Sequence, residues 1–214
     1  MFSRVISAAV YGIDAYIVNV ETDVGFGLPT FDMSGALGSK VREAKDRVRV
    51  AIKNSGIELT PQKIVINISP ANIRKEGTIY DLPIAIGILA ANGCFDLKIL
   101  ENVLIIGEVS LDGSINPVKG VLPMVCAAKE AGIDNCIIAK ANIAEGRIIN
   151  NINIYGVETL SQTIEILKNI AVIDGSRKNI KQADVKSGEC NKSDGNINND
   201  TYNVLERSRV KFTY

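Results

Sequence analysis

The chain has 214 residues, and its 24 lysines and arginines are balanced by 24 aspartates and glutamates. The net charge therefore points to neither a nucleic acid nor a membrane surface as a partner, and any basic site must be local. The chain contains no histidine, which excludes a Ser-His triad and a histidine-based zinc site within it. Its length and apolar content are sufficient for one medium-sized domain with a buried core.

The cysteines give no sign of a metal or redox motif. They are widely spaced and form no C-x-x-C pair: Cys94, Cys126, Cys136 and Cys190. Three of them lie in apolar surroundings, which favours buried small side chains in a reducing compartment. The start of the chain lacks the features of a secretory signal, and no window reaches 18 apolar residues. We therefore expect a cytoplasmic, soluble protein with no membrane partner and no metal site.

The first half of the chain predicts strands around one long helix. The expected strands are residues 4–10, 15–22, 30–34 and 63–69. The first two are rich in Val, Ile and Tyr and are joined at Gly12, which predicts a hairpin. The helix is expected to begin with Ser39 as its N-cap and to end at Gly56.

Strands and helices alternate in the second half. The expected strands are residues 103–110, 114–118, 135–139 and 153–157, with Asp112-Gly113 as a hairpin turn between the first two. The expected helices run from Gly120 to Gly132 and from Thr159, as the cap, to Asn169, with a short helix or loop over 141–149. This alternation over residues 1–170 predicts an α/β (α+β) fold with a mixed sheet and packed helices.

Residues 74–91 join a polar turn to an apolar helix, and we expect a functional loop at the joint. Asp81 precedes the apolar run, and Pro83 lies two residues after Asp81. This pairing is typical of an N-cap followed by an early-turn proline. The simpler interpretation is that Asp81 serves only as a cap. Strand, polar loop and helix together place loop residues at the edge of a sheet, where sites often lie.

The helix expected from residue 39 carries a local excess of positive charge. Its basic residues, with two more on the 74–91 segment, are the candidates for contacting DNA phosphates: Lys40, Arg42, Lys45, Arg47, Arg49, Lys53, Arg74 and Lys75. The alternative is a solvated helix face with pairs such as Glu43 with Arg47.

The composition changes near Asp174. Residues 187–203 are mostly Ser, Gly, Asn, Asp and Lys, which cannot bury enough apolar surface to offset the entropy of ordering. We therefore divide the chain into a domain over 1–172 and a flexible linker or tail over 173–214.

Short catalytic motifs are absent from the sequence. There is no G-x-x-x-x-G-K-[ST], no G-x-G-x-x-G after a strand and no G-x-S-x-G. A Ser-Lys dyad is the nucleophilic arrangement that needs no histidine. Two segments resemble the proteolytic domain of Lon proteases, KEGTIYDLPIAIGILAA and IGEVSLDGSINPVKGVLPMVCAAKEAGI.

A closer resemblance is to the ComM (YifB) group of magnesium-chelatase-like AAA+ proteins. It rests on GLPTFDMSG, VREAKDRVRVAI, IVINISPANIRKEG and YDLPIAIGILAA, and it covers residues 1–170. The resemblance implies a Lon-like fold, an AAA+ module that uses ATP and Mg beyond this chain, assembly into a homo-oligomeric ring, and branch migration of DNA in recombination and natural transformation. It implies no cofactor in this chain, which ends near where that module would begin.

The comparison with Lon also implies that the catalytic residues are lost. Aligning Lys75-Glu76-Gly77 with the Lon loop places Ile79 at the serine position, and aligning 117–121 places Leu122 at the lysine position. Lys119 is expected to point elsewhere. We therefore expect no catalytic residue, and the vestigial site loop comprises Glu76, Gly77, Thr78 and Asp81.

Two alternatives remain open. The first is an unusual hydrolase that uses Thr78 or Ser69 with Lys75 or Lys119, which would require a hydroxyl within reach of a desolvated lysine. The second is a purely structural cap on the ring without DNA contact.

Overall fold

The structure is a computed structural model that describes residues 1–170. The strands are β1 Phe2–Tyr11, β2 Asp14–Gly25, β3 Phe31–Ser34, β4 Lys63–Ser69, β5 Val103–Ile105, β6 Glu108–Val109, β7 Ile115–Asn116, β8 Asn135–Ala139 and β9 Asn153–Val157. The helices are α1 Ser39–Arg42, α2 Ala44–Asn54, α3 Asp81–Ala91, α4 Val121–Glu130 and α5 Ile143–Gly146, with 3-10 helices η1 Leu97–Asn102 and η2 Lys140–Asn142. Residues 160–170 are also helical. The predictions for 173–214 lie outside the described residues.

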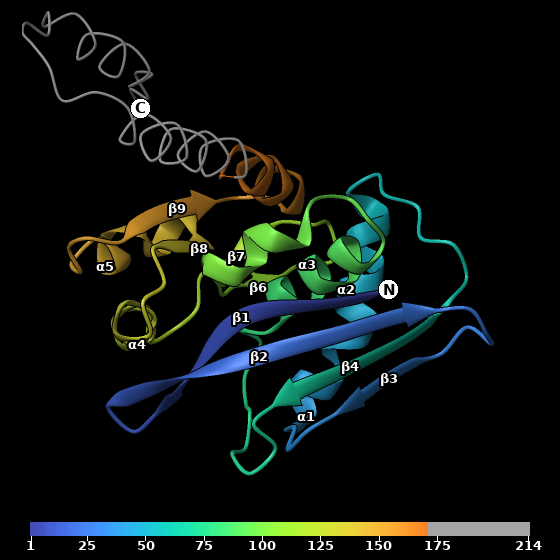
Figure 1. Cartoon of the computed structure of the whole chain (residues 1–214), viewed down its shortest axis with the longest axis horizontal. Helices are drawn as coiled ribbons and strands as arrows, with labels where there is room; N and C mark the ends of the chain where they lie inside the picture. Colours follow the sequence, from blue (N-terminus) through green and yellow to red (C-terminus); the bar gives the residue numbers. More distant parts are fainter. Residues whose placement is uncertain (171–214) are drawn as a thin grey trace, which may run out of the picture. The chain divides into compact units, whose positions relative to one another are not determined.

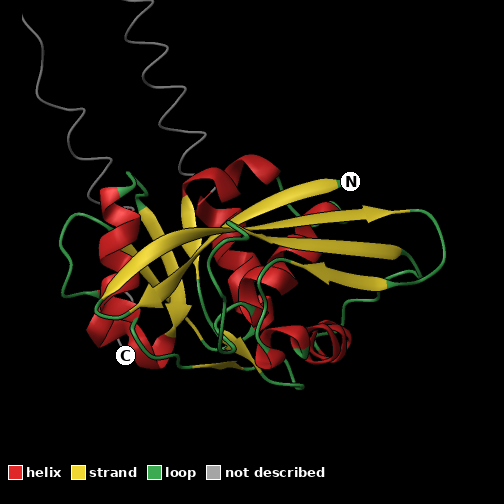
Figure 2. Ribbon diagram, turned by 90° about the horizontal axis from the view of Figure 1, so that it is seen from below, coloured by secondary structure: helices red, strands yellow, loops and turns green. Residues whose placement is uncertain are grey.

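Seven strands form one mixed sheet in the order β3-β4-β2-β1-β5-β8-β9, and β6 pairs with β7 separately. The hairpin predicted around Gly12 is confirmed, because β1 and β2 pair antiparallel from Phe2 opposite Asp23 to Tyr11 opposite Asp14. Pairing is antiparallel between β2 and β4, and parallel between β1 and β5, β5 and β8, and β8 and β9. Figure 1 labels β3, β4, β2, β1, β8 and β9 of this sheet, and Figure 2 shows the strands from below with helices on either side. The predicted α/β class with a mixed sheet is confirmed.

The central strands are buried on both faces. Neighbouring residues of β1 enter different cores, with Ala9 in the larger core and Ala8 in the smaller one. The same alternation on β5 sends Ile105 to the larger core and Leu104 to the smaller one. Helices α2 and α3 contribute to the larger core, and α4 contributes to the smaller one.

Helix α3 is the centre of the larger core, since all eleven of its residues are buried. After Asp81 the helix is apolar all round, as expected of a helix enclosed by other elements. Gly87 allows it to lie close to the sheet, because a Cβ at this position would come within 2.6 Å of Thr22 Oγ1. The Ser3 hydroxyl donates a hydrogen bond of 2.7 Å to the Gly87 carbonyl oxygen.

Four local predictions were wrong. The single helix over 39–56 is divided at Glu43 into α1 and α2, and Gly38 rather than Ser39 is the residue before its start. The single strand over 103–110 is divided into β5 and β6, which belong to different sheets. Asp81 is the first residue of α3 and makes no cap hydrogen bond; Tyr80 occupies the N-cap position. The cap predicted at Thr159 is confirmed, since its Oγ1 accepts a 3.2 Å hydrogen bond from the Gln162 N–H.

Candidate functional site

A cleft of ≈ 670 Å³ lies beside the loop that connects β4 to α3. The loop over 74–80 meets the segment over 117–119 there, together with the end of β1, the start of α1 and β6. The lining residues are Ala9, Val10, Lys40, Arg74, Glu76, Gly77, Thr78, Ile79, Tyr80, Glu108, Pro117, Val118 and Lys119. The cleft therefore contains most of the vestigial loop predicted from the sequence, as well as Lys40 and Arg74 from the predicted basic set.

Backbone pairing fixes the loop at Lys75. The Lys75 N–H donates to the Ala36 carbonyl oxygen at 2.8 Å, and the Lys75 carbonyl oxygen accepts from the Gly38 N–H at 2.9 Å. The side chain is inaccessible to solvent, and its Nζ donates to the Pro70 carbonyl oxygen. Burial lowers the pKa of the Lys75 ammonium. Lys75 therefore presents no cation to a phosphate on the surface, which corrects its place in the predicted basic set.

Thr78 bonds to a carboxylate rather than to a lysine. Its hydroxyl donates to Glu108 Oε2. The other carboxylate oxygen of Glu108 accepts from the Asn116 amide at 3.3 Å, and that amide also donates to Ser110 Oγ at 2.8 Å. Sequence analysis did not single out Glu108, because the contact joins residues thirty positions apart on segments whose pairing it had not predicted.

The two positions aligned with the Lon dyad lie in different pockets. Ile79 lines the cleft, whereas Leu122 lines a separate pocket of ≈ 530 Å³ beside α4. Lys119 lines a different pocket from Leu122, the residue aligned with the Lon lysine, and it lies at the same cleft as Thr78. Ser69, the other candidate hydroxyl, is not among the residues that line it.

Asp81 has a structural partner in Arg47. Its carboxylate is completely buried and accepts two hydrogen bonds, from Arg47 Nε at 2.8 Å and Nη2 at 2.9 Å. Burial raises the pKa of the Asp81 carboxyl, and the bonds from Arg47 oppose that effect. The hydrogen bond to Asp81 raises the pKa of Arg47. Arg47 Nη2 also donates to the Lys40 carbonyl oxygen at 2.8 Å. Arg47 is thus engaged inside the domain, which corrects its place in the predicted basic set.

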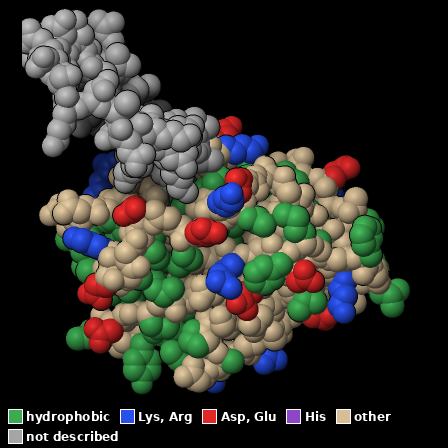
Figure 3. All heavy atoms as spheres, viewed as in Figure 1, with side chains coloured by type: hydrophobic (Ala, Val, Ile, Leu, Met, Phe, Trp, Pro, Cys, Tyr) green, Lys and Arg blue, Asp and Glu red, His purple; other side chains and the backbone are tan. Residues whose placement is uncertain are grey.

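Five of the six remaining predicted cations divide into two groups. Lys45, Arg49 and Lys53 are exposed and lie four residues apart on α2, so they form one stripe, here called the α2 stripe. Lys40 and Arg74 lie at the cleft instead. Figure 3 shows one face of the molecule, on which basic and acidic side chains are interspersed rather than gathered into a single patch.

Two side chains of the basic set make further contacts. Arg42 Nε donates to the Leu37 carbonyl oxygen at 3.2 Å. The Arg49 guanidinium carbon lies 5.8 Å from the centre of the Phe31 ring. Both arginines therefore contribute to local packing in addition to carrying charge.

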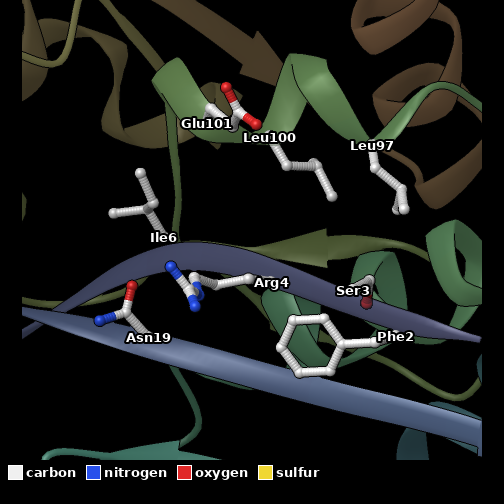
Figure 4. A pocket seen from close by; sticks show the side chains of 8 residues that line it. All are labelled: Phe2, Ser3, Arg4, Ile6, Asn19, Leu97, Leu100 and Glu101. Atoms are coloured by element: carbon white, nitrogen blue, oxygen red, sulfur yellow. The ribbon is translucent and has the colours of Figure 1, made fainter.

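A third pocket, of ≈ 350 Å³, lies between η1 and the β1–β2 pair. Figure 4 shows Arg4 and Asn19 side by side on β1 and β2, with Glu101 on η1 across from them. None of the site residues predicted from the sequence lines this pocket, and Arg4 Nε lies 3.9 Å from Glu21 Oε1. Within residues 1–170, no group of three or more His, Cys, Asp or Glu side chains is placed to hold a metal ion. None of the helices described there is long and apolar enough to cross a membrane.

The sequence of this chain also matches a known protein family. A family model described as subunit ChlI of Mg-chelatase matches residues 20–142. The chain therefore belongs to this magnesium-chelatase subunit family.

Individual relatives confirm the resemblance to the ComM group. The chain is 37% identical over 163 residues to competence protein ComM of Haemophilus influenzae, which covers 76% of this chain and 32% of that protein. It is 40% identical over 148 residues to the uncharacterised protein YifB of Escherichia coli, covering 69% of this chain and 29% of that one. Archaeal Lon protease of Thermococcus kodakarensis is 30% identical over 151 residues, covering 68% of this chain and 23% of the protease. The chain thus spans about a third of the length of ComM and YifB.

Proposed function

We propose that this chain is a non-catalytic Lon-like domain of a ComM-type AAA+ ATPase, which supports ring assembly and the handling of DNA during recombination. The proposal depends on the residues at the two positions that align with the Lon serine and lysine, Ile79 and Leu122. Both are aliphatic, and they lie in separate pockets. ATP and Mg belong to the AAA+ module of such a protein.

The cleft lacks the arrangement that peptide hydrolysis by a dyad requires. A nucleophile and its base must lie within hydrogen-bond reach of each other. The Thr78 hydroxyl donates to Glu108, and the Lys75 ammonium donates to a backbone carbonyl oxygen. Lys119 is exposed and lacks the desolvated environment that a lysine base needs. These contacts weigh against the alternative hydrolase.

The DNA part of the proposal is supported by the exposed α2 stripe and by the similarity to a protein named competence protein. Contacts from lysine and arginine to phosphates carry no base information, so binding should be independent of sequence. We expect a dissociation constant of about 10⁻⁴ to 10⁻⁶ M that weakens steeply with salt.

A pair of measurements tests this function. A fluorescent unfolded protein substrate and an active-serine probe should give neither cleavage nor labelling with the purified chain. A labelled DNA duplex or single strand should show binding whose strength falls as salt rises. Cleavage that survives repurification and is lost in Thr78→Val would establish the hydrolase instead. Absence of any salt-dependent DNA binding would leave the purely structural ring cap.

A further inference from the structure

We propose that the cleft beside the 74–80 loop is a binding site for a single DNA strand, whose phosphates are held by Lys40 and Lys119. This inference rests on the DNA part of the proposed function and assigns the contact to a specific place. It adds Lys119, which sequence analysis assigned to no DNA contact.

The charges of the cleft favour an anionic ligand. Its three cations, Lys40, Arg74 and Lys119, outnumber its two carboxylates. Glu76 pairs with Arg74 at 2.6 Å, whereas Glu108 accepts from the neutral side chains of Thr78 and Asn116 and keeps its charge. Lys40 and Lys119 are exposed, and no ion pair joins either of them to an acidic side chain within residues 1–170. They come from separate segments, α1 and the turn before α4, and both line the cleft. A phosphate that enters would therefore meet two ammonium groups that no described carboxylate neutralises.

The size and walls of the cleft favour a single strand over a duplex. Its ≈ 670 Å³ is comparable to sites that hold a small ligand, about 300–1,000 Å³, and suits one or two nucleotides. Its apolar lining includes Val10, Ile79 and Pro117. Apolar side chains beside cationic ones favour an unpaired strand, whose bases are free to pack against them.

Lys40 is held in position by the buried pair described above. Its carbonyl oxygen accepts from Arg47 Nη2 at 2.8 Å, which fixes the backbone while the side chain remains exposed. Substitution of the Lys40 side chain therefore tests binding without removing the Arg47–Asp81 pair, and variants of Arg47 or Asp81 are unsuitable for this purpose.

The test is fluorescence anisotropy of a labelled oligo-dT strand with the 214-residue chain at several salt concentrations. We expect Lys40→Glu/Lys119→Glu to raise the dissociation constant about tenfold or more, because two attractive contacts become repulsive. The milder Lys40→Gln/Lys119→Gln should lower the slope of log K against log salt by about 1.4, from about 0.7 for each phosphate contact on a single strand. Lys98→Glu is the matched control, since Lys98 is exposed and lies outside the cleft.

Each contrary result has a distinct meaning. If the cleft variants bind oligo-dT as the unchanged chain does, while Lys45→Glu/Lys53→Glu abolishes binding, the cleft assignment is wrong and the DNA function stands. If the unchanged chain binds no DNA, both proposals fail. If the cleft variants lose binding of a labelled acidic peptide but keep binding of oligo-dT, the cleft is a polypeptide site. Thermal unfolding of every variant verifies that it is folded.

Discussion

Arg47 on α2 and Asp81 at the start of α3 form a two-point ion pair, with Nε and Nη2 of the arginine at 2.8 Å and 2.9 Å from the two carboxylate oxygens. The pair joins the helix that carries the α2 stripe to the helix at the centre of the core. It also connects both helices to α1 through the Lys40 carbonyl oxygen. One arginine therefore fixes the relation between three helices next to the cleft.

Removing Arg47 should destabilise the domain strongly. Arg47→Ala leaves the completely buried Asp81 carboxylate without its positively charged partner and with only a backbone hydrogen bond from Val109, and we expect a loss of about 3–5 kcal/mol in the free energy of unfolding. Urea unfolding at pH 7 measures it. Glu43→Ala is the control, because Glu43 is exposed and 3.7 Å from Arg47 Nη1, and it should cost less than about 0.5 kcal/mol. Equal losses in both variants would show that the buried pair has no special role.

The cost of Arg47→Ala should depend on pH. Burial raises the folded-state pKa of Asp81 above its unfolded value, and in the variant no arginine opposes this effect. The protonated carboxyl is then the form favoured by folding, so its contribution is fully present below the unfolded pKa and is lost as pH rises through the folded pKa. The difference in stability between the variant and the unchanged chain should be smaller at pH 4 than at pH 7. A difference independent of pH would contradict this.

Gly87→Ala should destabilise the core although alanine favours helices. The new Cβ would lie 2.6 Å from Thr22 Oγ1 and 3.6 Å from Ser3 Oγ. Overpacking should cost about 1–3 kcal/mol in the free energy of unfolding, which is larger than the gain of about 1 kcal/mol in helix propensity. The net effect is therefore a loss of stability. Adding Thr22→Ala should restore part of the stability, since it removes the clashing atom. Thr22→Ala alone is the control, and absence of any recovery in the double variant would argue against this contact.

Cys136 should be unreactive in the folded chain. It is completely buried on β8, and burial raises the pKa of its thiol to about 12. The thiolate is the reactive form, so labelling at pH 8, mapped by mass spectrometry, should reach Cys136 only after unfolding in urea. The half-buried Cys126 is the internal control. Because the folded-state pKa exceeds the unfolded one, the Cys136 contribution to stability should be present below about pH 8.5 and fall as pH rises toward 12.

Much of the fold follows from local sequence patterns. The hairpin around Gly12, the alternating β4 and the capped helix after Thr159 depend on contacts close in sequence or on strand periodicity, and each was predicted. The break at Glu43 was missed because the apolar spacing of residues 41, 44, 48, 51 and 52 continues across it.

The candidate site was less predictable, because its key contacts join distant segments. Asp81 occupies a sequence position typical of a cap, and nothing local shows that Arg47, 34 residues earlier, reaches it. Lys75 stands in a charged stretch and resembles a surface cation, yet pairing with residues 36 and 38 places it inside. Lys119 was not predicted as a site residue, because it lies three residues before Leu122, the position aligned with the Lon lysine. The fold nevertheless places it at the cleft.

The structure also changes the variants that best test the α2 stripe. Two arginines of the predicted basic set are poor sites for charge reversal, because Arg42 donates to a backbone carbonyl oxygen and Arg49 lies over Phe31. Lys45 and Lys53 make no such contact with a described residue, so Lys45→Glu/Lys53→Glu should change the free energy of unfolding by less than about 0.5 kcal/mol per site.

The contact between Arg49 and Phe31 should contribute to stability. Arg49→Ala should lower the free energy of unfolding by about 0.5–1 kcal/mol because the cation–π contact is lost, and Phe31→Leu should remove the same cation–π contribution. Urea unfolding of the single variants and of Arg49→Ala/Phe31→Leu measures the coupling. Strict additivity in the double variant would show that the two side chains do not interact, and Arg49 would then serve as well as the lysines in DNA-binding tests.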